Sequence, residues 1–485
     1  MFWSKNVIVY EMFLSKNLLC SILLQSFVLL SFIFLGACSH TSDLEFEQIH
    51  TEIDLMLDPS QISQDYSSWY SQIKSEALDD LINEGLRNNW DLASSSAKVR
   101  ISKARFIQFG GYDKPQFSGS IASSKGKTNA VFSEISPSSR TTKNHQLSLD
   151  LLWEIDLWDR LSTLEEAYEN DWLANQLDLE AIKLSLCGNI SKTWFRFLTA
   201  EKKVALAVAN YRNVLKSTKQ IEELYNSGLK SSLDVRLSKS NLASFEVQIP
   251  ESKRIRDQFA RELEFWIGRY PKNSILLTGT LPIIKDALPS SIPSSLLLSR
   301  PDIVAAQKRL LSSNNFLIAS KKELLPKLSF VGNTGTSSNE FKDLLNSNLS
   351  VWNLAGNLTQ PIFQGKRLIQ EVEIQKAKLE DQVALYKKKV LQVFLEVENL
   401  LSNRNYNQSI YKASKNKVEE STAAEKIAWE RYQKGLIDFT SYLSTEQSKF
   451  NAENHLLDAH YQLIENFINL HIALALPVKL DHSTK

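Results

Sequence analysis

Two stretches of this chain lack the residues that usually end a helix. Residues 161–226 contain no proline and a single glycine, Gly188, and residues 366–434 contain neither residue type. A single α-helix over either stretch would be about 100 Å long, because a helix rises about 1.5 Å per residue. In the second stretch, apolar residues recur at three- and four-residue spacings between Val383 and Leu400, as they do in coiled coils. The sequence therefore predicts long helices that pair with one another.

The chain also contains an internal duplication. Two pairs of similar segments occur in the same order, 211 and 207 residues apart: residues 91–115 with 302–326, and residues 225–229 with 432–436. We predict two halves, residues 82–270 and 293–476, joined by a linker at 271–292 and followed by a tail at 477–485. Each half is expected to contain a helix that ends before a proline, two strands, a very long helix and a second long helix after a glycine. The helices that end before a proline are predicted at residues 72–110 and 301–324.

The N-terminus has the pattern of an export signal. Residues 18–35 are apolar, lysines precede them, and small residues lead directly to Cys38. An uncleaved transmembrane helix is the alternative, since a run of this length could just cross a bilayer. A basic start, an apolar stretch and a small-residue exit are typical of a signal peptide, and the residues up to Cys38 resemble the bacterial lipobox. We therefore predict a signal peptide at 1–37, lipid attachment at Cys38 and a lipidated N-terminal segment at 38–81.

Residues 146–158 alternate between apolar and polar side chains. Every odd position is apolar, whereas the even positions include Asp150, Glu154 and Asp156. The segment is longer than the roughly 9–11 residues that a tilted strand needs to cross a bilayer. A half-buried sheet in a soluble protein would alternate in the same way, but the export signal and the lack of a second long apolar run favour an outer-membrane β-barrel. The other three strands are predicted at residues 116–124, 327–336 and 348–362.

Four strands cannot close a barrel, because a closed barrel needs about eight or more. An open edge in lipid would leave backbone N–H and C=O groups without hydrogen-bond partners. The chain must therefore form oligomers. Two copies are the minimum and three copies would give twelve strands, and the sequence alone does not choose between them.

Charge and composition exclude several classes of protein. Lys and Arg number 56 and Asp and Glu number 55, and this balance argues against binding to nucleic acid. Three cysteines cannot form a disulfide framework, and Cys187 is expected to pack as a small apolar side chain. No phosphate-binding, dinucleotide-binding or zinc-protease motif is present, and His455 and His460 are poorly spaced to share a metal on one helix face. We therefore predict no catalysis, no cofactor and no metal site.

Several motifs together resemble the outer-membrane efflux protein family. They are the lipobox, the duplication, WEIDLW at 153–158, LTQPIFQGKR at 358–367 and Tyr-x-x-Gly-Leu after both long helices. Within that family the chain is most similar to lipidated TolC-like channels of resistance–nodulation–division pumps. The resemblance implies an α+β membrane protein: a homotrimer whose twelve-stranded β-barrel lies in the outer membrane and whose antiparallel coiled-coil helices form a tunnel in the periplasm.

The same resemblance implies partners and a function. The partners would be a periplasmic adaptor protein, an inner-membrane pump and outer-membrane lipid, and the chain would conduct drugs or other small toxic solutes out of the cell. A conduit for type I protein secretion is one alternative. A lipid-anchored coiled-coil scaffold without a bore is the other.

At the barrel end of the long helices, the resemblance suggests roles for acidic residues. In a closed ring, Asp150, Glu154 and Asp156 would line the barrel lumen. The alternative places Asp156 and Asp159 at the junction between barrel and helices. Asp159 departs from the glycine that the family often has there, whereas Gly365 would keep that role in the second half.

At the opposite end, related channels narrow their periplasmic entrance with two acids that follow the second glycine. Those two positions are serines here, so we expect the closed aperture to depend on helix packing and on Asp234 or Asp438. The aperture candidates are Gly228, Asp234, Gly435, Asp438, Ser441 and Ser444. Candidate contacts for the adaptor are Tyr225, Leu229, Tyr432 and Leu436, although these side chains could equally pack within the turns.

Overall fold

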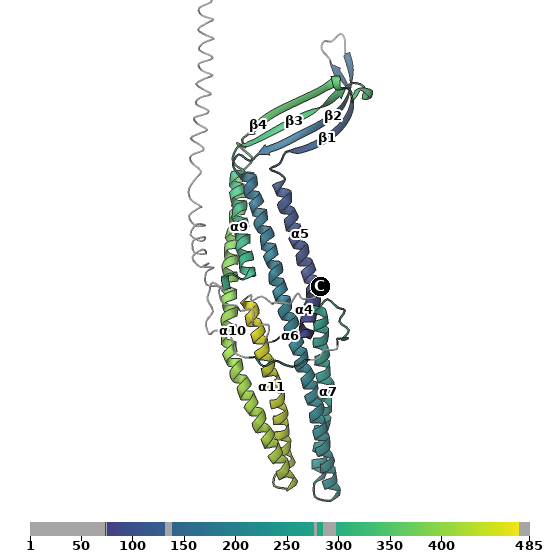
Figure 1. The fold of residues 1–485 in the computed structure, drawn as a ribbon, viewed down its shortest axis with the longest axis vertical. Coiled ribbons are helices and arrows are strands. Elements are labelled where there is room, and N and C mark those ends of the chain that lie inside the picture. The colour runs from purple at the N-terminus through teal and green to yellow at the C-terminus, as the bar shows by residue number, and fades with distance from the viewer. Residues whose placement is uncertain (1–72, 74, 131–137, 276–278, 285–296, 475–485) are drawn as a thin grey trace, which may run out of the picture. The chain divides into compact units, whose positions relative to one another are not determined.

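The computed structural model describes residues 73, 75–130, 138–275, 279–284 and 297–474 (Figure 1). The predicted signal peptide at 1–37, the lipid-attachment residue Cys38 and the tail at 477–485 lie outside the described residues. Half of the predicted linker at 271–292 is described, at residues 271–275 and 279–284.

The helices of the first half follow the predicted order with one difference. They are α4 (Glu76–Asn88), α5 (Trp90–Gly110), α6 (Arg160–Asn226) and α7 (Ser232–Trp266). The prediction of one helix over 72–110 is wrong, because Asn89 has an extended ψ of 130° and separates α4 from α5. Its side chain accepts hydrogen bonds from the backbone N–H groups of Asp91 and Leu92, which caps the new helix.

The helices of the second half repeat the first. They are α9 (Pro301–Lys322), α10 (Arg367–Gln433) and α11 (Phe439–Ala473). Helices α6 and α10 each have 67 residues, and α7 and α11 each have 35. Helices α10 and α11 each start 207 residues after their counterparts α6 and α7, at 367 against 160 and at 439 against 232. The prediction of two very long helices is confirmed to within one residue at each end.

Helix α6 lies at the centre of the helical packing. It packs against α5, α7, α9 and α11, while α10 packs against α9 and α11 (Figure 1). Gly188 allows a close approach of α6 to α11, because a Cβ atom there would overlap the side chain of Ile472. The predicted coiled-coil stripe of α10 faces inward, with Val393 and Val397 buried. Among the described residues, no helix combines the length and apolarity needed to cross a bilayer.

The strands form one antiparallel sheet in the order β1-β2-β3-β4. They are β1 (Gln116–Ala130), β2 (Ser138–Ile155), β3 (Lys327–Ser338) and β4 (Ser350–Thr359). The β1–β2 pair is longer than predicted because its ladder continues through polar residues to Ala130 opposite Ser138. Within the described part of the chain, β1 and β4 are edge strands with no partner on their outer sides.

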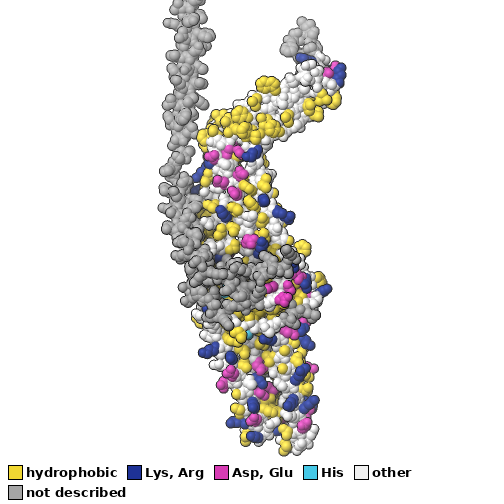
Figure 2. Space-filling model, viewed as in Figure 1, with side chains coloured by type: hydrophobic (Ala, Val, Ile, Leu, Met, Phe, Trp, Pro, Cys, Tyr) yellow, Lys and Arg dark blue, Asp and Glu magenta, His cyan; other side chains and the backbone are white. Residues whose placement is uncertain are grey.

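The register of the sheet places most of the large apolar residues of the four strands on one face, whereas Leu152, Val331 and Val351 lie on the other. Leu147 lies opposite Ile121, Trp153 opposite Phe330, and Leu328 opposite Leu358. The other face carries Asp150 opposite Asn333, which in turn lies opposite Asn353. Hydrophobic side chains gather visibly where the sheet meets the helices (Figure 2). The predicted two-faced sheet is confirmed.

Candidate functional site at the helical tips and the sheet–helix junction

Both long hairpins turn at a glycine in the left-handed conformation. Gly228 has φ 74° between α6 and α7, and Gly435 has φ 71° between α10 and α11. In each turn the following leucine closes a backbone hydrogen bond to the last turn of the helix, from Leu229 to Leu224 (2.8 Å) and from Leu436 to Arg431 (2.9 Å). Glycine adopts this conformation without the steric penalty of a Cβ atom, which explains the repeated motif.

Tyr432 connects the two hairpins at their tips. Its side chain is only 1% exposed, and its hydroxyl donates a hydrogen bond to the Asp234 carboxylate at 3.3 Å. The Lys230 ammonium donates to the Tyr432 carbonyl at 2.7 Å and lies 3.8 Å from the centre of the tyrosine ring. One residue of α10 is therefore held by Lys230, in the α6–α7 turn, and by Asp234, in the first turn of α7.

An aromatic cluster packs behind this contact. Its buried members come from three helices: Ile221, Ala428, Tyr432, Phe439 and Tyr442. By contrast, Tyr225 is 44% exposed, Leu229 70% and Leu436 68%. Three of the four candidate adaptor contacts are thus accessible in the protomer. The assignment of Tyr432 as an adaptor contact is wrong, because its ring is buried within this cluster.

Asp438 and Asp234 occupy different positions at the tips. Asp438 is the N-cap residue of α11, and its carboxylate accepts a hydrogen bond from the Ser441 backbone N–H at 2.7 Å. Asp234 lies in the first turn of α7, where Ser231 is the cap. Ser441 and Ser444 are exposed. Of the two acids predicted to hold the aperture, only Asp234 bridges the hairpins.

A buried carboxylate that we did not predict lies one turn further into the hairpin pair. Glu446 of α11 accepts hydrogen bonds from the Tyr442 hydroxyl at 2.7 Å and from the Asn241 side chain of α7 at 2.6 Å. Burial raises the pKa of Glu446. It lines a cleft of about 240 Å³ between the hairpins, together with Glu425 and Lys449, which form an ion pair of 3.3 Å. The spacing of Glu446 four residues after buried Tyr442 is the signal that could have revealed it.

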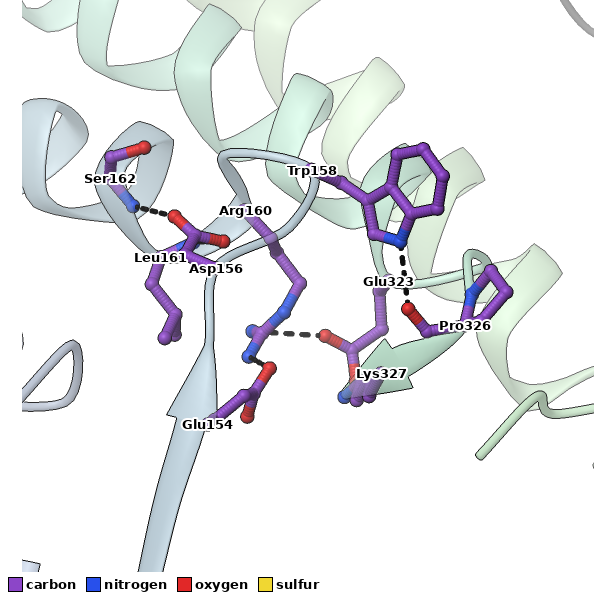
Figure 3. Close-up of polar contacts among 9 residues, drawn as sticks. All are labelled: Glu154, Asp156, Trp158, Arg160, Leu161, Ser162, Glu323, Pro326 and Lys327. Carbon is purple, nitrogen blue, oxygen red and sulfur yellow. Dashed lines mark hydrogen bonds and ion pairs between the residues drawn. The ribbon is translucent and has the colours of Figure 1, made fainter. Parts of the chain in front are cut away.

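Asp156 lies at the junction of sheet and helix rather than on the strand. Strand β2 ends at Ile155, and the Asp156 carboxylate accepts hydrogen bonds from the backbone N–H groups of Leu161 (3.0 Å) and Ser162 (2.8 Å) (Figure 3). A carboxylate in this position satisfies free donors at the start of α6 and interacts well with its dipole. The assignment of Asp156 to a barrel lumen is therefore wrong, and its alternative, the junction, is correct.

Glu154 remains on β2 but is paired with a base. Arg160 donates to it at 2.7 Å and also contacts Glu323 at 3.2 Å, which in turn pairs with Lys327 at 2.6 Å (Figure 3). Asp150 differs because it accepts a hydrogen bond from the Ser148 hydroxyl at 3.0 Å and makes no ion pair within the described residues. Of the three predicted lumen acids, Asp150 alone has neither a base nor the start of a helix beside it within the described residues.

The residues that start the two long helices share a strained backbone. Asp159 has φ 56° and Lys366 has φ 65°, and both are the N-cap residues of their helices. The equivalent of Asp159 is therefore Lys366, and the assignment of that role to Gly365 is off by one residue. Gly365 also has a positive φ of 57°. Glycine would adopt the left-handed conformation of Asp159 with less steric strain than a residue that carries a Cβ atom.

The described residues contain no group of three or more His, Cys, Asp or Glu side chains arranged to hold a metal ion. His455 contacts the Ser414 hydroxyl at 3.1 Å, and His460 donates to the carbonyl of Pro282 at 2.9 Å, so the two histidines have different partners. Cys187 is buried, and burial raises its pKa to about 12. A thiol with this pKa is unreactive at neutral pH, as expected for a packed side chain.

The known proteins that this chain resembles are named as efflux proteins or as outer-membrane channels. The family "Outer membrane efflux protein" matches residues 81–269 and 292–476. The chain is 26% identical over 408 residues to the solvent efflux pump outer membrane protein SrpC of Pseudomonas putida, covering 83% of this chain and 85% of that protein. It is 25% identical to the cation efflux system protein CusC of Escherichia coli O6:H1, covering 84% and 88%. The solved structure of the outer-membrane channel OprN is similar with a TM-score of 0.81 at 24% identity, covering 87% of this chain and 94% of that one.

Proposed function

Because this chain belongs to the outer membrane efflux protein family, we propose that three copies assemble into the outer-membrane conduit of a tripartite efflux pump. The sheet carries this proposal, since it has one apolar face and two open edges, β1 and β4. Backbone groups in lipid must all be paired, so β4 of one copy would pair with β1 of the next until the ring closes. Three copies give a closed barrel of twelve strands.

The helices support the same assembly. Helix α10 buries Val393 and Val397 against its own chain, yet it exposes Leu385, Leu391 and Leu395 on another side. A helix with two apolar sides needs two neighbours. The second side would pack against the adjacent subunit and extend the bore through a periplasmic tunnel.

The cargo class proposed is small toxic solutes rather than one compound. The relatives SrpC and CusC are named for solvents and for cations, although their identities to this chain are nearly equal. A conduit that selects little agrees with such different cargoes, and selection would then fall to the inner-membrane pump. The efflux names of these relatives favour solute efflux over type I protein secretion.

The proposed protein partners follow from the helical tips, and the proposed lipid anchor follows from the N-terminus. A periplasmic adaptor would dock at the tips through exposed Tyr225, Leu229 and Leu436, and a resistance–nodulation–division pump would lie beneath it. Cleavage after residue 37 and lipidation of Cys38 would anchor the N-terminus in the outer membrane.

We further propose that the closed aperture is held by the contact of Tyr432 with Asp234 and Lys230, and not by a ring at 441 and 444. Both of those positions are exposed serines that offer no carboxylate to a cation. Trivalent cations should therefore block the purified channel weakly in planar bilayers. Tight block that disappears in Ser441→Ala would refute this gating proposal.

Two measurements test the conduit itself. The purified full-length protein should migrate as an SDS-resistant trimer that heating dissociates, and it should conduct ions in planar bilayers. A water-soluble monomer without conductance would instead support the scaffold alternative.

A further inference from the structure

The far end of the β1–β2 hairpin, away from the helices, has a strong excess of positive charge. Between residues 125 and 145 the sequence has four bases and one acid, Glu134, which lies outside the described residues. The bases are Lys125, Lys127, Arg140 and Lys143, and all four are exposed. None makes an ion pair with another described residue, and dark-blue side chains are visible at this end of the sheet (Figure 2).

Three of these bases lie on the apolar face of the sheet. Lys125 lies opposite Lys143, and Ile121 lies opposite Leu147. The two pairs are separated by four residues along each strand, so both lie on the same face of the sheet. Side chains two residues apart on a strand point to the same face, so Lys127 joins this set. Arg140 pairs with Thr128, an even position, and therefore belongs to the opposite face. We call Lys125, Lys127 and Lys143 the lysine row.

An aromatic border separates the lysine row from the apolar side chains. His145 contacts the Ser123 hydroxyl at 2.9 Å, and the ring of Phe341 stands edge-on to it at 5.7 Å. Phe341 is 65% exposed. Along β1, Lys125 follows Ile121 by four residues, or about 13 Å at 3.3 Å per residue. The order apolar, aromatic, basic matches hydrocarbon, interface and headgroup layers of a bilayer.

The ammonium groups of the lysine row repel one another when no anion lies between them. Directly opposite side chains have Cβ atoms about 5 Å apart, and like charges at that distance repel. Lys127 adds a third ammonium about 7 Å along the same strand. A phosphate group between these ammonium groups would accept charge-assisted hydrogen bonds and remove the repulsion.

We propose that the lysine row binds the phosphate groups of anionic lipid in the outer leaflet, once in each subunit. The occupant is a lipid, since only an amphiphile can place acyl chains on Ile121 and Leu147 while its phosphate reaches the lysines. The proposal rests on the proposed function, because it requires the sheet to stand in the membrane with this end outward.

The test uses the full-length trimer in detergent and two purified lipids, bis-phosphorylated lipid A and the same lipid without phosphates. Binding is measured by native mass spectrometry. The wild-type trimer should retain the phosphorylated lipid at least about tenfold more strongly than the dephosphorylated form. The double variant Lys125→Gln/Lys143→Gln should lose most of this preference.

A matched control removes two charges from the same end of the sheet without touching the row. Arg140→Gln acts on the opposite face, and Lys342→Gln removes a base that already pairs with Glu340 at 2.7 Å. This double control should bind phosphorylated lipid as the wild type does. Equal binding of both lipids by the wild type, or an equal loss in the control, would overturn the proposal.

Conductance in a bilayer of neutral lipid separates this inference from the proposed function. The Lys125→Gln/Lys143→Gln variant should still form trimers and conduct. Conducting trimers without any phosphate preference would refute the lipid site alone, whereas a wild-type protein without conductance would refute the conduit.

Discussion

The hydroxyl of Tyr432, in the last turn of α10, donates a hydrogen bond to the Asp234 carboxylate, in the first turn of α7, across 3.3 Å. This bond joins the two hairpins through residues that are 198 positions apart in sequence. Lys230 strengthens the contact through the carbonyl and the ring of the same tyrosine. Because this contact lies at the tips, we expect it to restrain the width of the proposed aperture.

Tyr432→Phe should widen the aperture without unpacking the aromatic cluster. The substitution removes the hydroxyl and keeps the ring, so the free energy of the closed tips should rise by about 1 kcal/mol. Single-channel conductance in planar bilayers should increase. Tyr225→Phe is the control, because Tyr225 is the exposed equivalent in the first half, and its conductance should match the wild type.

Asp150 and Glu154 should differ in their effect on ion selectivity. Arg160 compensates Glu154, whereas Asp150 has no base beside it within the described residues. Reversal potentials across a salt gradient should show a weaker cation preference for Asp150→Asn and little change for Glu154→Gln. A larger effect of Glu154→Gln would mean that the Arg160 contact is absent from the assembled channel.

His471 should make the protein sensitive to acid. Burial lowers the pKa of His471 to about 4, from an ordinary value of 6.5. Between these values the unfolded state binds more protons than the folded state, so the free energy of unfolding falls as pH decreases through this window. The loss for one subunit amounts to about 3 kcal/mol once pH is below the folded value. Melting temperatures at pH 7.5 and 4.5 should differ less in His471→Gln than in the wild type.

Gly228→Ala and Gly435→Ala should each destabilise a tip. Their φ values of 74° and 71° are unfavourable for alanine by about 1 kcal/mol. Limited proteolysis should cut both variants faster at the affected turn. Gly119→Ala, in a strand with open space around the new Cβ atom, should be cut as slowly as the wild type.

Asp159→Gly should stabilise the start of α6. Asp159 has φ 56° and makes no capping hydrogen bond with its side chain, so glycine relieves strain worth about 1 kcal/mol and loses no contact of the carboxylate to the helix. Asp156→Ala should act in the opposite direction by about 1 kcal/mol, because that residue caps the helix. Heat-induced dissociation of the trimer in SDS would measure both.

The long helices and the faces of the sheet were predictable because each depends on local chemistry. The great length of α6 and α10 follows from stretches with no proline and at most one glycine, and the apolar face of β2 follows from alternation. The break at Asn89 was missed, since asparagine within a helical pattern gives no sign that it will cap the next helix. The continuation of β1 and β2 through polar residues was missed because polar strands carry no alternation.

The sequence by itself determined that this chain has repeated long hairpins and a sheet for an apolar environment. Only the tertiary structure decided that the two copies of the Tyr-x-x-Gly-Leu motif make different contacts. Tyr225 and Tyr432 occupy the same place in the same motif, yet one is exposed and the other is buried. Tyr432 meets Lys230 and Asp234 from the other hairpin, whereas the positions 207 residues further on hold Ile437 and Ser441, which offer neither charge. Contacts between segments so far apart in sequence depend on how the hairpins pack, and no local pattern encodes them.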